Sequence, residues 1–315
     1  MQSLQTIKQR LRSVKNIGQI TKAMELVAAT KMRKSQEVAL LSRPYAYAAL
    51  EFLANLSHVS STYVPPLLEK RIIEKTAVVV MASDKGLTGS FNSAVFRAFE
   101  NWRNEIGSSA STWKPSFQVI AVGQKTVSYL QKRVGNIEKA FVKFGDITKV
   151  EEARPLAKYL IDGYLTKEWD RVLVFYTNFR SAMQQDVVVR ELFPVTFEKL
   201  KETAEEIIPK TGRYAKEGYG ASFKERKHGD NEYIIEPSPE AVLRELIPHL
   251  IVMQVYHIIL EANASEHAAR RLAMKNASDN ASDIVDDLTL EYNKSRQAGI
   301  TKELTEITAG AEALN

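Results

Sequence analysis

The sequence predicts an α/β fold: a long antiparallel coiled coil of N- and C-terminal helices plus a Rossmann-like, mostly parallel α/β domain. Each end of the chain is nearly free of Gly and Pro, and strand-like and helix-like segments alternate between the ends. A helix over 1–58 would be about 80 Å long or more, which exceeds the width of a small domain. The two ends must therefore pair and protrude. We expect a helix at 1–58, the α/β domain at 70–200, a mobile polar loop at 201–237 and a helix at 238–315.

The first helix is predicted from a stripe of apolar residues. The stripe starts with heptad-like spacing and then becomes irregular: Leu4, Ile7, Leu11, Val14, Ile17, Ile20, Met24 and Val27. A seam that drifts off a strict heptad predicts a loose supercoil. The β-branched residues and paired prolines of 57–66 are expected to end this helix.

The central domain is predicted from alternating strand and helix patterns. Strands are expected at 72–82, 117–122, 138–145, 171–179 and 186–195, with helices after the turn at 83–90, at 124–133 and from about 148 onward. Such alternation is typical of a mostly parallel sheet. Thr148 and Glu151 are expected to form a capping box.

The last helix is predicted to begin at Pro239, with Ser238 as its N-cap. Pro248 should kink this helix or delay its regular start. Antiparallel pairing with the shorter first helix leaves an overhang at about 297–315, whose Ile300, Leu304 and Ile307 suggest that a partner encloses it. The alternative is a frayed tail.

Charge is divided between the two ends. Residues 1–58 hold nine Lys or Arg against three Glu, and residues 239–315 hold seven against twelve Asp or Glu. Opposite charge favours pairing of the helices, although each exposed pair contributes only a few tenths of a kcal/mol. The basic stripe would suit an acidic protein surface or nucleic acid, or it is simply a solvated helix face.

Composition excludes several classes of protein. The chain has no Cys, so disulfides, thiolate catalysis and cysteine-bound zinc are excluded, and a reducing compartment is expected. No apolar run is expected to reach the roughly 18–20 residues of a membrane span. The N-terminus lacks the apolar core of a secretory signal and is interpreted as mature protein.

No catalytic, cofactor-binding or metal-binding site is predicted. "SDKGLTGS" (83–90) lies where phosphate loops lie but lacks their spacing, so we interpret it as a tight turn between strand and helix. His257 and Glu261 are helical neighbours without an evident third metal ligand, and we expect a surface pair. The acidic pairs Asp286–Asp287 and Glu303/Glu306 are interpreted as solvated charge.

Both ends resemble one known family. The blocks "IKQRLRSVKNIGQITKAMELVAATKMRKSQ" (7–36), "ASEHAARRLAMKNASDNA" (264–281) and "LTLEYNKSRQAGITKELTEITAGAEAL" (288–314) are similar to the γ subunit of F-type ATP synthases. "SDKGLTGSFN" (83–92) resembles the family's turn after the first strand. Arg271 and Thr88 depart from the family pattern, which usually has Met and Cys there.

The resemblance implies a central rotor shaft that performs no chemistry. The shaft turns inside a hexamer of α and β subunits, and its α/β domain lies near the ε subunit and the c-ring of the membrane sector. It couples proton or sodium flow to ATP synthesis, peripherally on the cytoplasmic face of the bacterial cell membrane. The resemblance implies no cofactor and no nucleic-acid partner.

The family's β-subunit contact and coupling residues carry over to six positions: Met24, Arg270, Arg296, Gln297, Thr301 and Glu303. Arg296 and Gln297 fall at the expected start of the overhang, where an Arg fork suits bidentate pairing with carboxylates. Two other classes stay open from the residues alone: an α/β enzyme with a coiled-coil dimerisation arm, and a nucleic-acid-binding coiled coil.

Overall fold

A computed structural model of the chain describes residues 3–41, 65–69, 71–108, 116–196 and 236–312. Residues 42–58 of the helix expected at 1–58, nearly all of its expected end at 57–66 and nearly all of the loop expected at 201–237 lie outside the described residues. The chain divides into two compact units, one of residues 1–29 with 270–315 and the other of residues 30–269. The elements are α1 (Leu4–Leu41), β1 (Lys75–Met81), α3 (Phe91–Ser108), β2 (Ser116–Val122), α4 (Gln124–Arg133), β3 (Lys139–Phe141), α5 (Val150–Leu165), β4 (Arg171–Phe179), β5 (Gln185–Phe193) and α9 (Pro239–Glu312).

The unit of residues 30–269 is built on a five-stranded sheet of order β3-β2-β1-β4-β5. β3, β2, β1 and β4 are parallel, and β5 pairs antiparallel with β4. The predicted α/β fold with a mostly parallel sheet is therefore confirmed. The central strand β1 is buried at every residue after its first, as its continuous apolar sequence requires in a sheet covered on both faces.

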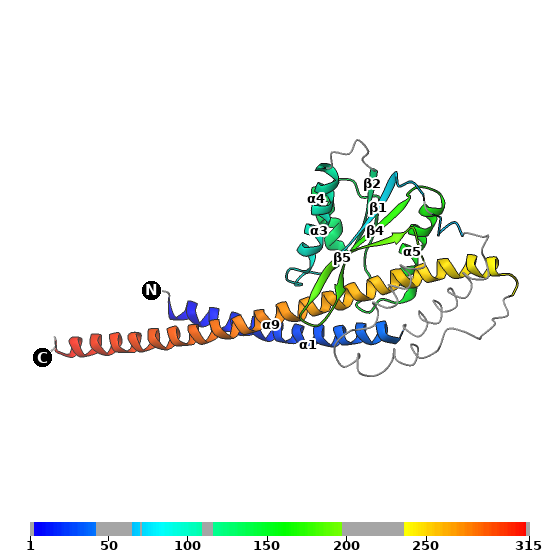
Figure 1. Ribbon diagram of the computed structural model, residues 1–315. Helices are drawn as coiled ribbons and strands as arrows, with labels where there is room; N and C mark the ends of the chain where they lie inside the picture. Colours follow the sequence, from blue (N-terminus) through cyan, green and yellow to red (C-terminus); the bar gives the residue numbers. More distant parts are fainter. Residues whose placement is uncertain (1–2, 42–64, 70, 109–115, 197–235, 313–315) are drawn as a thin grey trace. The chain divides into compact units, whose positions relative to one another are not determined.

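Helices cover both faces of this sheet (Figure 1). α3 and α4 pack on one face through Val95, Phe99 and Leu130. α5 and the first third of α9 pack on the other, around Leu160 and Ile251. The second core is the larger of the two, so α9 is held to the sheet by an extensive apolar surface.

The start of α9 agrees only in part with its prediction. The backbone N–H of Ala241 donates to Ser238 Oγ at 3.2 Å, which confirms the N-cap. The helix begins at Pro239 and continues through Pro248, so the expected delay is wrong. An interior proline costs roughly 3 kcal/mol, but Leu243, Ile247 and Ile251 are each at most 3% exposed on either side of it. Their burial offsets that cost.

The apolar character of α9 is stronger than expected from sequence. One 18-residue stretch reaches a mean hydropathy of 1.3, long and apolar enough by composition to cross a membrane, and 56% of it is buried inside the protein. The prediction that no run approaches this length is therefore wrong. These residues serve as the core helix of an α/β domain.

Polar contacts correct the predicted capping box of Thr148 and Glu151. The capping box of α5 uses Glu152 rather than Glu151, because the Lys149 N–H donates to Glu152 Oε2 at 2.9 Å. Thr148 instead accepts a hydrogen bond from Asn263 Nδ2 at 2.8 Å. Its hydroxyl is therefore engaged with α9, where the sequence spacing gave no sign of a partner.

His257 and Glu261 do not form a surface pair. His257 is 4% exposed, within the buried stretch of α9. Glu261 accepts a hydrogen bond from the Tyr176 hydroxyl at 3.0 Å, which ties α9 to β4. The strand expected at 138–145 is also shorter, since Lys143 takes a φ of 67° that a strand cannot continue through.

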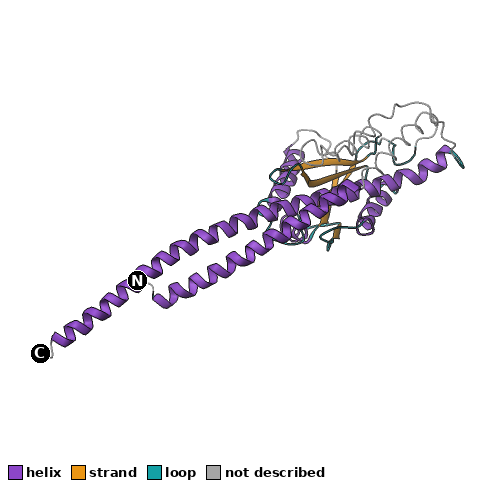
Figure 2. Ribbon diagram, turned by 90° about the horizontal axis from the view of Figure 1, so that it is seen from below, coloured by secondary structure: helices purple, strands orange, loops and turns teal. Residues whose placement is uncertain are grey.

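The other unit is a two-helix coiled coil (Figure 2). Its seam on α1 is a regular heptad whose members are all buried or half-buried: Ile7, Leu11, Val14, Gly18, Thr21, Glu25 and Ala28. The matching seam on α9 is Met274, Ser278, Ala281, Val285, Leu288, Tyr292 and Ser295. A Cβ added at Gly18 would meet Ala281 Cβ at 3.4 Å, so the helices approach closely at this point.

The predicted seam of α1 is therefore wrong beyond Val14. Ile17, Ile20 and Val27 are 52%, 59% and 53% exposed. In this part of the coiled coil the helices meet through smaller and polar residues such as Gly18, Thr21 and Glu25. Small side chains permit the closer backbone approach, and the large apolar residues turn outward.

Candidate functional site

Four of the six predicted contact residues gather near the end of α9. Arg296, Gln297, Thr301 and Glu303 are all exposed. On a helix, Arg296 and Glu303 share a face, as do Gln297 and Thr301, because positions three, four and seven apart align. The Thr301 hydroxyl donates to the Gln297 carbonyl at 3.0 Å within this face. We call residues 296–310 the tip.

The tip alternates the predicted contact residues with large apolar ones. Ile300, Leu304 and Ile307 are 50%, 58% and 68% exposed. The seam residues of α9 end at Ser295, and every described side chain from Arg296 to Gly310 is exposed. Figure 2 shows α9 continuing past the N-terminus of α1. The tip is thus a helix without a partner inside the described chain, with apolar surface that water does not favour.

The other two predicted residues lie further down the coiled coil. Since Gly18 faces Ala281 and the helices are antiparallel, Met24 lies near the level of residue 275. Arg270 lies about 8 Å from that level along the axis, and the tip begins about 39 Å from Arg270. The structure therefore places the six residues in two zones, the tip and a mid-shaft zone around Met24.

The mid-shaft zone contains an apolar row that the sequence argument assigned to the seam. Ile17, Ile20, Met24 and Val27 follow helical spacing on the outward side of α1. Met24 is half-buried, and the other three are more than half exposed. Arg270 is 9% exposed, whereas the other predicted contact residues are half-buried or exposed. The heptad of small residues at Gly18, Thr21 and Ala28 is the signal that could have identified the outward row.

One ion pair lies beside the seam. Lys22 Nζ is 2.9 Å from Glu25 Oε2. The hydrogen bond with Glu25 raises the pKa of Lys22, and the charges of Glu25 and Asp279 add to it. Glu25 is 8% exposed at its seam position, so Lys22 supplies the charge that this buried carboxylate requires.

The α/β unit has a cleft of about 440 Å³ at the carboxyl ends of its parallel strands. Its polar lining includes Asp84, Lys85, Gln124, Asp146 and His267. Ligands of doubly wound sheets bind at such edges. Here Asp84 already occupies the hydrogen-bond donors: its carboxylate accepts from the N–H of Gln124 at 2.8 Å and from the N–H of Phe144 at 3.1 Å. The start of α4, where an anion would bind, is filled by the chain's own carboxylate.

The turn at 83–90 is held by internal hydrogen bonds. Ser83 Oγ donates to the Lys85 carbonyl at 2.6 Å, and Asn92 Nδ2 donates to Thr88 Oγ1 at 3.1 Å. Leu87 and Gly89 take positive φ values of 65° and 56°. This geometry agrees with the interpretation of the segment as a tight turn. Among the described residues, no group of three or more His, Cys, Asp or Glu could hold a metal ion.

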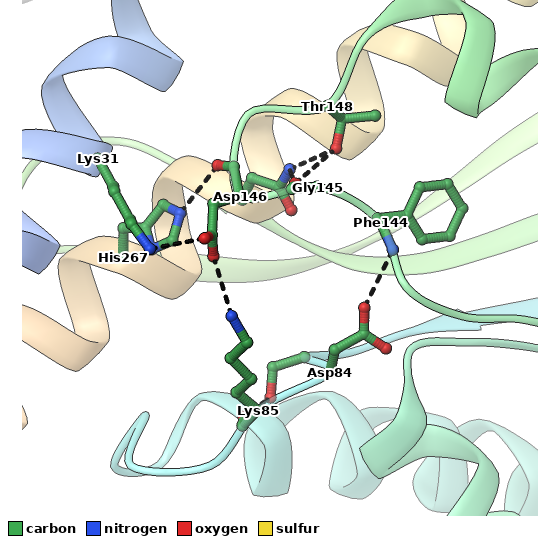
Figure 3. A network of polar contacts seen from close by, with 10 residues as sticks. Lys31, Asp84, Lys85, Phe144, Gly145, Asp146, Thr148 and His267 are labelled. Atoms are coloured by element: carbon green, nitrogen blue, oxygen red, sulfur yellow. Dashed lines mark hydrogen bonds and ion pairs between the residues drawn. The ribbon is translucent and has the colours of Figure 1, made fainter.

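A polar network surrounds Asp146, in the connection between β3 and α5 (Figure 3). Asp146 Oδ2 is 2.6 Å from Lys31 Nζ on α1, and Oδ1 is 3.6 Å from Lys85 Nζ. Its carbonyl lies 3.1 Å from His267 Nε2 on α9. The hydrogen bond from Lys31 lowers the pKa of Asp146, with further lowering from the charges of Lys31, Lys85 and His267 against the opposing effect of burial.

Comparison with known proteins connects the two units to one family. A family model described as ATP synthase matches residues 3–314. The ATP synthase gamma chain of Geotalea uraniireducens is 39% identical over 314 residues, covering 100% of this chain and 99% of that one. That of Moorella thermoacetica is 37% identical and covers 100% of both chains.

Solved structures agree with this fold. A chain of the Tetrahymena thermophila mitochondrial ATP synthase central stalk and c-ring is 25% identical, with a TM-score of 0.54, covering 82% of this chain and 99% of that one. A chain of the Euglena gracilis mitochondrial ATP synthase has a TM-score of 0.63 at 18% identity, covering 99% and 94%. Together with the full-length match, these similarities show that the chain belongs to the ATP synthase gamma chain family.

Proposed function

We propose that the chain is the central-stalk rotor subunit of an F-type ATP synthase. It couples ion-driven rotation to the conformational cycle of a catalytic hexamer of α and β subunits and is not itself catalytic. The observation that carries this proposal is the coiled-coil unit. Its large apolar side chains Ile17, Ile20 and Val27 face outward, and its α9 tip extends without a partner in the described chain. Such a surface is built to be enclosed by other subunits.

At the tip, Arg296 and Gln297 contact a loop of a β subunit. An exposed guanidinium offers a planar fork that pairs bidentately with carboxylates. Thr301 and Glu303 extend the polar contact by one to two turns. Ile300, Leu304 and Ile307 lie against an apolar sleeve formed by the hexamer, which supplies the burial that a single helix lacks in water.

In the mid-shaft zone, Met24 and the outward apolar row face the lever regions of the β subunits. Met is flexible and polarizable, so it keeps contact with a surface that slides past it. Arg270 is 9% exposed, and we assign it a supporting role in which it holds the α9 backbone in register behind this contact surface.

The α/β unit lies near the ε subunit and the c-ring. In this role the chain is associated peripherally with the cytoplasmic face of the bacterial cell membrane. Rotation presents a different face of the asymmetric shaft to each β subunit in turn. The shaft thereby changes which β conformation is favoured, as a coupling free energy between distant sites.

Co-purification tests this proposal directly. Tagged chain co-expressed with the α and β subunits of its own source should be recovered in one copy with three of each. The chain alone should hydrolyse no ATP. ATP hydrolysis by the isolated chain, or its recovery as a homodimer without the hexamer, would favour an enzyme with a dimerisation arm and refute the rotor function.

A point variant tests the tip. Arg296→Ala should slow hydrolysis by the assembled complex without changing the unfolding temperature of the chain, because an exposed side chain contributes little to folding. Lys294→Ala is the matched control, since Lys294 is also exposed and lies about 200° around the helix from Arg296. Equal rates for the two variants would refute the role of Arg296.

A further inference from the structure

The connection between β3 and α5 is bound to both long helices at once. From α1, Lys31 Nζ reaches Asp146 Oδ2 at 2.6 Å. From α9, His267 Nε2 lies 3.1 Å from the Asp146 carbonyl. A carbonyl oxygen only accepts, so His267 Nε2 carries the hydrogen and donates it. Figure 3 shows Lys31 and His267 converging on Asp146 from two different helices.

A second contact from α9 holds the other side of the same connection. Asn263 Nδ2 donates to Thr148 Oγ1 at 2.8 Å and to the Gly145 carbonyl at 3.4 Å. Asn263 and His267 are four residues apart, so they share one face of α9. One turn of α9 therefore binds the connection at both its ends. We call Lys31, Asp146, Asn263 and His267 the clasp.

The two helices depend on the clasp to different degrees. α9 contributes a long series of buried residues to the large core, from Leu243 to Ala262. Among the described side chains, that core contains one partly buried residue of α1, Val38. Apolar contact is not directional, whereas an ion pair with a short hydrogen bond specifies where a side chain must be. The clasp therefore matters most for α1.

The Lys31–Asp146 pair contributes little to the free energy of folding, so we infer that it positions α1. The two side chains are 33% and 39% exposed, so solvent screens them. Pairs of this kind contribute at most about 1 kcal/mol to folding. The pKa of Asp146 is nevertheless lowered chiefly by its hydrogen bond with Lys31, which is consistent with a closed pair at neutral pH.

The clasp residues Lys31 and His267 lie close in sequence to the two points where the chain passes from one unit to the other. The chain divides into its two units at 29/30 and 269/270. Lys31 lies two residues after the first division, and His267 lies three residues before the second. α1 and α9 are continuous helices through both points. The chain passes from one unit to the other along these two helices, within one turn of Lys31 and His267.

We propose that the clasp is a torque-bearing lock, in which Asp146 fixes α1 against the α/β unit so that the two helices turn together. This proposal rests on the rotor function proposed above. Without the Lys31–Asp146 contact, α1 would slide along α9 under load, and part of each rotation would be lost between the membrane sector and the hexamer.

The first test measures the lock itself, without any assumption about rotation. In the purified chain, Lys31→Met should speed amide hydrogen exchange across residues 144–148 by about 1.4- to 5-fold, the factor that corresponds to the 0.2–1 kcal/mol range of exposed pairs. Lys34→Met is the matched control, since Lys34 is exposed and lies one turn further along α1. Equal exchange in the two variants would overturn the lock.

The second test measures torque transfer in the assembled, membrane-bound enzyme. Lys31→Met and Asp146→Asn should each lower ion pumping per ATP hydrolysed, and the double variant should be no worse than either single variant. Lys31→Arg should retain coupling, because Arg can still reach Asp146. Normal pumping per ATP in Lys31→Met would refute the torque role. Failure of the wild-type chain to join the hexamer would refute the rotor function instead, while the exchange test would still decide the lock.

Discussion

Gly163 offers a stringent test of the packing on which the α/β unit depends. It lies in α5 directly against the ring of Trp169. A Cβ added at Gly163 would overlap three atoms of that ring, far inside van der Waals contact. Trp169 is 0% exposed, and its Nε1 donates to the Leu160 carbonyl at 3.1 Å. The ring therefore has no free direction in which to move.

The expected cost of Gly163→Ala follows from three contributions. Overpacking a dense core costs roughly 1–3 kcal/mol. Displacing Trp169 breaks its hydrogen bond to Leu160 and leaves a buried donor unsatisfied, at about 1–3 kcal/mol. Alanine stabilises a helix interior by about 0.5–1 kcal/mol relative to glycine, which opposes the other two. We expect a net loss of about 2–4 kcal/mol, or a fall in Tm of about 5–15 °C for a unit of this size.

Thermal unfolding followed by tryptophan fluorescence measures this loss. Gly107→Ala is the matched control, because Gly107 lies in α3 with nothing within 4 Å of its added Cβ. We expect the control to change stability by at most about 1 kcal/mol. If Gly163→Ala unfolds at or above the wild-type temperature, the proposed contact between α5 and Trp169 is wrong.

Three further predictions concern other parts of the chain. Burial raises the pKa of Tyr129 to about 12, and the hydrogen bond that its hydroxyl donates to the Glu100 carboxylate adds to the rise. The unfolded chain ionises this group at lower pH, so its stabilising effect should be lost as pH rises from about 10 to 12. Tyr129→Phe should remove one step near pH 12 from a tyrosine absorbance titration. Asp84→Asn should destabilise the α/β unit by about 1–3 kcal/mol in urea unfolding, because the amide can accept from only one of the two backbone N–H groups now bound; unchanged stability would show that this carboxylate does not hold the strand ends together. Deleting 305–315 should weaken assembly with the hexamer and leave the α/β unit folded by circular dichroism, and normal coupled ATP synthesis would contradict the role of the tip.

The α/β unit was predictable because its burial follows hydrophobic periodicity. The continuous apolar run of β1 and the ten-residue helix α4 appear within three residues of their expected ends. Periodicity reports which residues are apolar, but it does not report which polar groups meet. The shift of the capping box to Glu152 and the bond between Tyr176 and Glu261 depend on contacts between distant segments, so no local pattern could predict them.

The predicted seam of the coiled coil was wrong for a different physical reason. Hydrophobicity predicts a seam along Ile17, Ile20 and Val27. In the structure the seam runs through Gly18 and Ala28, whose small side chains allow the two helices to approach closely. A helix pair can gain contact area from small residues that let the backbones come together, at the cost of leaving larger residues in water. Patterns of small residues at heptad spacing therefore deserve equal weight with apolar ones when such a shaft is read from sequence.

The exposure of large apolar residues outside the seam bears on how the proposed rotor would turn within a hexamer of other subunits. The small and polar seam residues at Gly18, Thr21 and Glu25 contribute little apolar burial in this part of the coiled coil, and the outward apolar row gains burial only when other subunits cover it. Because the row lies on one side of α1, the enclosing subunits meet unequal surfaces at any instant. Under the proposed rotor function, contact energy would then differ among three chemically identical sites, which is the condition for one rotating element to bias them in sequence. The apolar residues that appear misplaced in a coiled coil are thus the ones that a rotor requires.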